Sequence, residues 1–169
     1  MTADNPMRRI SIEKILLSSG GKDKELEKAA KLLAFLSSMK VQIVASAKRI
    51  PDFDVRPGLE VGARVTLRGK KALELLRILL GAIDNVLSKR KLSENHFSFG
   101  ISEYIDIPGI EYQRDIGIRG LNVTVVFSRP GLRVKRKKIK SGTIPKKQFV
   151  SKEEIIKYME DNFKTEFIK

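Results

Sequence analysis

The residues best able to do chemistry in this chain are the cations of one stretch, residues 129–147, which reads RPGLRVKRKKIKSGTIPKK. It holds nine Lys and Arg residues and no acid, in a chain whose formal net charge is +14. Excess charge of one sign is a binding and steering property rather than a folding one, so a polyanionic partner is expected. The nine cations are Arg129, Arg133, Lys135, Arg136, Lys137, Lys138, Lys140, Lys146 and Lys147.

Residues suited to catalysis or metal binding are scarce. The chain has no Cys and a single His, His96, so it offers no thiolate nucleophile, no sulfur-ligated zinc site and no ready Ser–His–Asp triad. Asp52 and Asp54 have the spacing of a Mg²⁺-binding pair, but no third acid is visibly placed to complete a nuclease site. Acids beside a proline are common in turns. We therefore expect neither enzymatic activity nor a cofactor.

Two further groups of residues suit RNA. Thr66 alternates with the apolar residues of a predicted strand, so it lies on the polar face, with Arg64 and Arg68 close by. Such a face can donate hydrogen bonds to sugars and base edges while the flanking cations bind phosphates. Phe53 lies upstream in a proline-containing loop with basic neighbours. Phe53 has two possible roles in this loop: an exposed ring would stack on an unpaired base, whereas a buried ring would anchor the loop. The spacing alone does not decide between these two interpretations.

The elements that must position these residues follow from hydrophobic periodicity. Predicted strands cover residues 8–19, 41–47, 61–67, 96–107 and 121–128; predicted helices run from 23 to about 36, from 70 to about 88, and from 152 to 163. The first strand is expected to direct Ile10, Ile12 and Leu16 inward, the fourth Phe97, Phe99, Ile101, Ile105 and Ile107, and the last Leu121, Val123, Val125 and Phe127. The spacing of Ser151 and Glu154 predicts a capping box at the last helix.

The resulting order, β-α-β-β-α-β-β-α, predicts an α+β fold, a two-layer sandwich with helices on one face of a sheet, as a single domain spanning residues 1–169. Apolar residues interrupt the basic stretch, so we expect an anchored ribbon or loop rather than a free tail. The expected anchors are Leu132, Val134, Ile139, Ile144 and Phe149. The longest apolar runs are far shorter than the 18 to 20 residues, roughly, that a membrane span needs, so no membrane partner is expected.

Several ordered motifs resemble the large-subunit ribosomal protein L5 family in its archaeal and eukaryotic form. They are VTLRG (65–69), FSFGISEYIDIPGIEYQRDIGIRGLNVTV (97–125), RPG (129–131) followed by the basic run, IPK (144–146) and SKEEII (151–156). The resemblance runs from about Asn5 to Phe163, with family halves at about 8–62 and 63–165. It implies a curved antiparallel sheet with helices on its convex side.

The resemblance also implies a role on the cytoplasmic ribosome. Family members bind 5S ribosomal RNA, attach it to the large-subunit ribosomal RNA in the central protuberance, bridge to a protein of the small-subunit head, and lie near the P-site tRNA. Thr66 and Phe53 match family positions associated with 5S RNA recognition. In the commoner, bacterial-type pattern of the family, an Asn follows the first strand and a Gln precedes the second strand. In this chain these two positions hold Ser18 and Met39.

The candidate ribosomal-RNA-binding residues are therefore Ser18, Phe53, Arg64, Thr66, Arg68, Arg133, Lys135, Arg136, Lys137, Lys138 and Lys140. The candidate tRNA-proximal loop is 47–60, with Lys48, Arg49, Phe53 and Arg56. Two alternatives belong to other classes: an RNA-processing enzyme, which would need an acid cluster, a reactive side chain or a cofactor loop, and a DNA-architectural protein, which the charge alone would permit.

Overall fold

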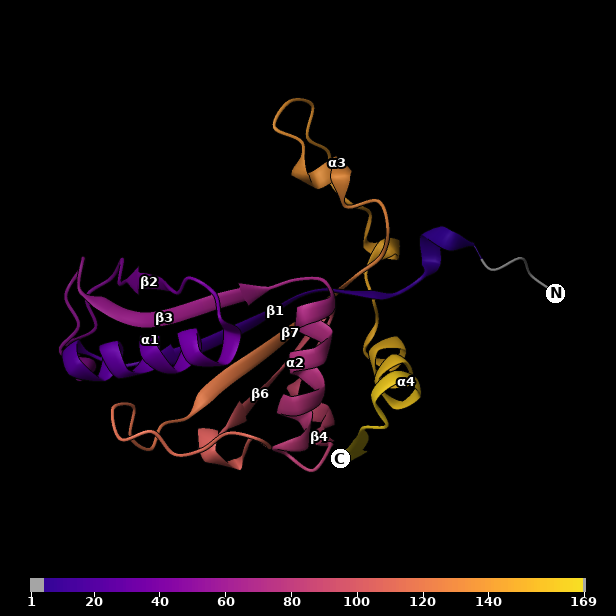
Figure 1. Cartoon of the computed structure of the whole chain (residues 1–169). Coiled ribbons are helices and arrows are strands. Elements are labelled where there is room, and N and C mark those ends of the chain that lie inside the picture. The colour runs from indigo at the N-terminus through magenta and orange to yellow at the C-terminus, as the bar shows by residue number, and fades with distance from the viewer. Residues whose placement is uncertain (1–4, 169) are drawn as a thin grey trace.

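The computed structural model describes residues 5–168, which form an antiparallel sheet with the three longest helices on one face (Figure 1). The sheet strands are β1 (Ser11–Gly20), β2 (Gln42–Ala45), β3 (Glu60–Leu67), β5 (Leu92–Ser93), β6 (His96–Ile101) and β7 (Leu121–Ser128), in the order β2-β3-β1-β7-β6-β5. The helices are α1 (Asp23–Ser37), α2 (Lys70–Gly81), α3 (Arg133–Arg136) and α4 (Lys152–Phe163). The predicted two-layer α+β sandwich is confirmed.

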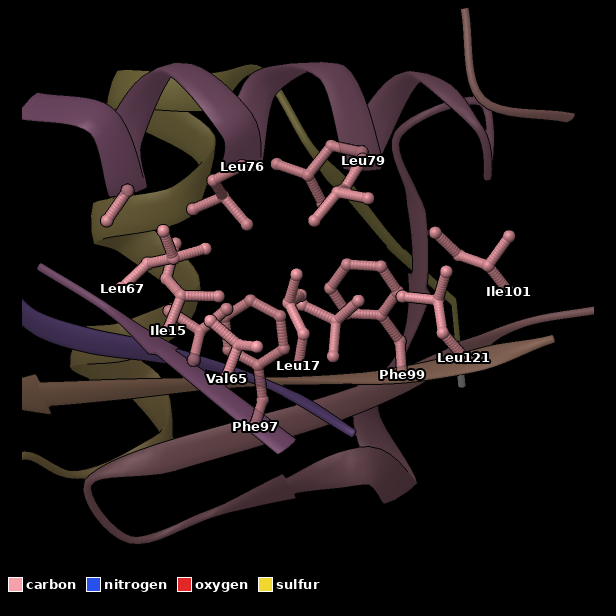
Figure 2. Close-up of a cluster of buried hydrophobic side chains, with 14 of the residues drawn as sticks. Ile15, Leu17, Val65, Leu67, Leu76, Leu79, Phe97, Phe99, Ile101 and Leu121 are labelled. Atoms are coloured by element: carbon pink, nitrogen blue, oxygen red, sulfur yellow. The ribbon is translucent and has the colours of Figure 1, made fainter. Parts of the chain in front are cut away.

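One hydrophobic core joins the sheet to α1, α2 and α4. Figure 2 shows Leu76 and Leu79 of α2 directed down onto side chains from β1, β3 and β6. The predicted inward residues of the last sheet strand, Leu121, Val123, Val125 and Phe127, are all buried. Tyr158 of α4 packs edge-on against Phe127, with ring centroids 5.6 Å apart. Within residues 5–168, this packing leaves the opposite face of the sheet without a helical layer.

The first strand has a different phase from the predicted one. Ile15 and Leu17 are fully buried, whereas Leu16 lies on the opposite face. The pairing with β7 shifts register between Ile12 and Lys14, where an extra residue is inserted on the β1 side. A bulge of this kind reverses which residues point inward. Ile12 is partly buried as expected, but the prediction for Leu16 was wrong.

The second predicted helix ends earlier than expected. α2 stops at Gly81, and Asp84 and Asn85 adopt left-handed conformations, with φ of 52° and 58°, which end helical geometry. The chain then forms β4 (Val86–Ser88), which pairs in parallel with β8 (Glu166–Ile168) as a separate two-stranded sheet. Within residues 5–168, no helix combines the length and apolar character needed to cross a membrane.

The strand predicted over 96–107 is also shorter, because β6 ends at Ile101. A 3-10 turn follows, and it buries Tyr104 completely while leaving Ile105 exposed. The Tyr104 hydroxyl accepts a hydrogen bond from the Gln113 amide at 2.8 Å, which ties down the long connection to β7. The inward orientation of Ile107 is confirmed and that of Ile105 was wrong.

Candidate nucleic-acid interface

The uncovered face of the sheet carries a row of polar residues that crosses five strands. Facing partners in antiparallel strands point to the same side of the sheet, so the register defines the row. From β2 to β6 it reads Gln42, Arg64, Ser18, Asn122 and Gly100. The Arg64 Nε donates to the Gln42 Oε1 at 3.0 Å, which holds the guanidinium across the β2–β3 pair. We call this face the polar sheet face.

A second row lies next to the first on the same face. It reads Thr66, Leu16, Thr124 and Ser98, and the hydroxyls of Ser98 and Thr124 are 3.0 Å apart. The predicted site residues Ser18, Arg64 and Thr66 are thus brought together on adjacent strands. Ser18 lies within β1 rather than after it, which differs from the position expected from the family pattern.

The amide expected at position 39 has a substitute on the polar sheet face. Met39 lies before β2 and is exposed, so it supplies no hydrogen-bonding group there. Gln42, three residues later, presents its amide beside Arg64. The face therefore still carries an amide at its β2 edge, from a residue that the sequence analysis did not single out.

Arg68 continues the basic character beyond the end of β3. It is exposed and precedes Gly69, whose positive φ of 72° turns the chain into α2. Lys70 and Lys71 then occupy the first turn of α2, where no acid is present. Cations at a helix N-terminus are unfavourable toward the helix dipole, so their placement there favours a role toward an external anion.

The loop between β2 and β3 presents Phe53 to solvent. Ile50 and Val55 exchange backbone hydrogen bonds of 2.9 and 3.0 Å, which close the loop into an ordered hairpin. Val55 is buried and anchors the hairpin, whereas Phe53 at its tip is 66% exposed. An open groove of about 840 Å³ lies between this tip and the first turn of α1. The geometry favours the stacking interpretation of Phe53 over the anchoring one.

The same loop carries its cations outward. Lys48, Arg49 and Arg56 are all exposed. Asp54 is the left-handed residue that ends the turn, with φ of 51°, in agreement with the turn interpretation of the Asp52–Asp54 pair. Across residues 5–168, no group of three potential ligands among His, Cys, Asp and Glu is arranged to hold a metal ion.

The basic stretch forms an arm that projects from the end of β7 and returns to α4 (Figure 1). We define the arm as residues 130–149. Its short helix α3 exposes Arg133, Lys135 and Arg136, and the following turn exposes its lysines as well. The predicted anchors were partly wrong, because Val134 and Phe149 are exposed and Ile139 is 80% exposed. Only Leu132 and Ile144 are half-buried.

Polar contacts hold the base of the arm in place of the missing apolar anchors. Arg129 is only 11% exposed, and its Nη2 donates to both Glu154 carboxylate oxygens, at 2.5 and 2.6 Å. Gln148 donates from its Nε2 to the Pro130 carbonyl at 2.9 Å, which joins the two ends of the arm. Arg129 therefore has a structural role, although it belongs to the same run of cations.

Glu154 links the arm to the last helix. Its carboxylate accepts from the Ser151 amide at 3.0 Å, and the Ser151 hydroxyl accepts from the Glu154 amide, which confirms the predicted capping box. Burial by itself would raise the pKa of Glu154. The hydrogen bonds from Ser151 and Arg129 outweigh this effect and hold the pKa below its ordinary value.

Arg136 also has a protein partner, which the sequence analysis did not anticipate. Its guanidinium pairs with Glu13 of β1, and this contact links α3 to the edge of the polar sheet face. Arg136 remains 60% exposed. Of the six arm residues predicted to bind RNA, five have no ion pair within the described part of the chain: Arg133, Lys135, Lys137, Lys138 and Lys140.

The arm and the polar sheet face are continuous. Lys14 of β1 faces Val126 of β7 on the polar face, and both also line a cavity beneath the arm. Asn122, Thr124 and Ser98 were not among the predicted site residues. The alternation of their strands already placed Asn122 and Thr124 outward, but only the pairing of β7 with β1 and β6 brings them beside Ser18.

The arrangement is that of a basic α+β protein with an open sheet face and a cationic arm, and its relatives identify its class. The model for the C-terminus of the ribosomal protein L5 family matches residues 60–158. Proteins named large ribosomal subunit protein uL5 match nearly the whole chain. That of Nanoarchaeum equitans is 39% identical over 168 residues, covering 98% of this chain and 99% of the relative. That of Picrophilus torridus is 38% identical over 171 residues, covering 99% and 97%.

The chain belongs to the ribosomal protein L5 family. A third relative, the uL5 protein of Archaeoglobus fulgidus, is 39% identical over 159 residues, covering 93% of this chain and 89% of its own. The chain is therefore a structural protein of the large ribosomal subunit and not an enzyme, and it works on the ribosome in the cytoplasm.

Proposed function

We propose that this chain binds 5S ribosomal RNA and attaches it to the large-subunit ribosomal RNA in the central protuberance. The observation that carries the proposal is the polar row of Arg64, Ser18 and Asn122 on a sheet face without a helical layer, continuous with the cationic arm. Side chains on a sheet can hydrogen-bond sugars and base edges of RNA, while cations around them bind phosphates.

The two parts of the surface have different tasks in this proposal. The polar sheet face carries side chains whose orientation is fixed by hydrogen bonds, such as the Arg64–Gln42 and Ser98–Thr124 pairs, and these suit recognition of shape and base edges. The arm carries long exposed cations, which suit phosphates of any sequence. The arm therefore supplies affinity and the sheet face supplies specificity.

The loop over 47–60 gives a third contact. We infer that its exposed Phe53 stacks on an unpaired base and that Lys48, Arg49 and Arg56 bind phosphates around it. The resemblance to the L5 family, which implies the contact of Phe53 with 5S RNA, also implies that this loop lies near the P-site tRNA. A further contact, to a protein of the small-subunit head, completes the proposed role as a bridge between subunits.

A filter-binding titration tests the proposal. Purified protein is titrated with 5S ribosomal RNA, tRNA and a random DNA duplex at several salt concentrations. A preference for 5S RNA that persists as salt rises supports recognition by the sheet face and the loop. If the three affinities fall together, the protein is only a polycation and the proposal is wrong; a preference for the duplex would point to a DNA-architectural protein.

Phe53→Ala tests the loop within the same assay. Loss of one stacked base is expected to weaken 5S RNA binding by about 1–3 kcal/mol. Phe35→Ala is the matched control, because Phe35 is an exposed aromatic on α1, away from the polar sheet face, and its loss should leave affinity unchanged. Equal losses for Phe53→Ala on 5S RNA and on an unrelated RNA would refute the selective role of Phe53.

A further inference from the structure

A cavity of about 460 Å³ lies at the angle between the arm and the sheet. Its volume falls within the range of about 300–1,000 Å³ in which proteins bind small molecules. Residues from β1, from the end of β7 and from both ends of the arm line it, so the arm forms its roof. The contacts proposed above use Lys135 and Arg136 of its lining but assign no ligand to the cavity itself.

The cavity walls have two chemical characters. Leu132, Ile144 and Phe149 of the arm form an apolar wall with one aromatic ring. Lys14 and Lys135 contribute cations from the sheet and from α3. An apolar wall beside a cationic one matches a nucleotide, whose base is flat and apolar on its faces and whose phosphate is anionic.

The charge balance of the cavity favours an anion. Glu13 is the one acid in its lining, and it is already paired with Arg136. The cations of Lys14 and Lys135 therefore remain uncompensated by the lining. Arg136, 60% exposed beside them, can exchange its carboxylate partner for a phosphate oxygen.

Two amide side chains in the lining are fixed in orientation. Gln148 donates to the Pro130 carbonyl at 2.9 Å, and the Asn95 Oδ1 accepts from the Val150 amide at 2.7 Å. These bonds hold each amide group in the cavity wall, where it is suited to contact the edge of a base. A purely anionic ligand would leave the apolar wall and these amides unused.

The position of the cavity identifies the source of the nucleotide. Lys14 and Val126 lie both on the polar sheet face and in the cavity lining, so an RNA strand on that face reaches the cavity without interruption. We propose that the cavity binds a single nucleotide extruded from that strand. Its base packs against Leu132, Ile144 and Phe149, and its phosphate contacts Lys14 and Lys135. This inference rests on the proposed function, since it assigns the RNA a specific subsite.

The test uses two substitutions of the same kind in the arm. Ile144→Trp adds a bulky ring inside the cavity, whereas Ile139→Trp adds the same ring at an exposed arm position, and neither changes the charge. Full-length protein is titrated with AMP, adenosine and inorganic phosphate by NMR. AMP should shift the backbone amides of Leu132 and Phe149 at lower concentration than either part alone. Ile144→Trp should abolish these shifts and Ile139→Trp should keep them.

The RNA readout follows with the same proteins. Ile144→Trp should weaken 5S RNA binding about tenfold, as expected for one lost stacked base, and should lower the salt slope by no more than about 0.7–0.9, the share of the one phosphate that the cavity holds. Ile139→Trp should bind as the unsubstituted protein does. Should Ile144→Trp fail to fold, Lys14→Ala replaces it, and it should weaken AMP binding while leaving any weak adenosine binding intact.

Other outcomes overturn the inference. If inorganic phosphate shifts the same amides at the same concentrations as AMP, the cavity recognises only an anion. If Ile144→Trp binds 5S RNA like the unsubstituted protein, the RNA does not occupy the cavity. Failure of the proposed function would give a different result, because the unsubstituted protein would then show no preference for 5S RNA. The AMP titration contains no RNA, so it tests the cavity independently of that preference.

Discussion

Replacing Lys137, Lys138 and Lys140 with alanine removes three exposed cations of the arm that have no ion pair within residues 5–168. Each cation that meets one phosphate contributes about 0.7–0.9 to the slope of log affinity against log salt. If all three contact RNA, the slope should fall in magnitude by about 2–2.7. The loss should be similar for 5S RNA and for unrelated RNA, because phosphates carry no sequence information.

The matched control removes the same charge elsewhere. Lys28 and Lys31 of α1 and Lys157 of α4 are exposed, in the helical layer and away from the polar sheet face. Their triple alanine variant has the same net charge as the arm variant, so it separates local contact from long-range attraction. Filter binding at four or more salt concentrations gives both slopes. An unchanged slope for the arm variant, or equal changes for the two triples, would refute the assignment of the arm to phosphate binding.

Two further predictions concern stability. Glu154→Gln should lower the free energy of unfolding by about 1–2 kcal/mol at neutral pH, through the lost charge of the cap and of the Arg129 contact. The pKa of Glu154 in the folded protein lies below its ordinary value of 4.5. The difference in stability between the two proteins should therefore stay constant at pH values above the pKa that Glu154 has in the unfolded chain, and shrink as the pH falls through its pKa in the folded protein. Urea titrations at several pH values check this. A difference that grows toward acid would contradict it. Phe97→Ala should cost about 3–5 kcal/mol in urea unfolding, because its buried ring packs between Phe99 and Phe127, while the exposed Phe35→Ala should cost little. A small loss for Phe97→Ala would mean that the core closes around the missing ring.

The strands whose two faces differ most in polarity were predictable. β7 alternates apolar and polar residues at every position except Val126, and its four inward residues were identified correctly. β1 has the same kind of pattern, but the bulge between Ile12 and Lys14 reverses its phase. The run from Ile15 to Leu17 is apolar at every position, so either phase directs apolar side chains inward and the pattern gave no sign of the reversal.

Elements predicted from local periodicity were also too long where backbone geometry determines their ends. The apolar spacing of α2 continues through Ile83 and Leu87, and both contribute to the core, Leu87 from a strand instead of a helix. Asp84 and Asn85 are the residues that tolerate the left-handed conformation between them. The partner of β4 is β8, about 80 residues later in the chain, and no short-range pattern predicts such a pairing.

The residues of the candidate site also differ in how far they could be predicted from the sequence. Residue type and local alternation were enough to select Arg64, Thr66 and the cations of the arm. The ion pairs of Arg129 and Arg136 join residues that are distant in sequence, so the pairing of these two cations with acids could not be predicted. The polar row likewise depends on β1 lying between β3 and β7, which is a property of the whole sheet.

That row has a consequence for how the protein is made. Its residues come from strands that begin at Ser11 and end at Ser128, so the row is assembled only after most of the chain has been synthesised and β7 has docked on β1. A partly folded chain exposes the same side chains without their alignment. If RNA binds the aligned row as proposed, it binds only completed molecules, and by mass action it stabilises them against reopening. Assembly of the ribosomal subunit would then incorporate correctly folded copies and exclude partly folded ones without a separate quality-control step.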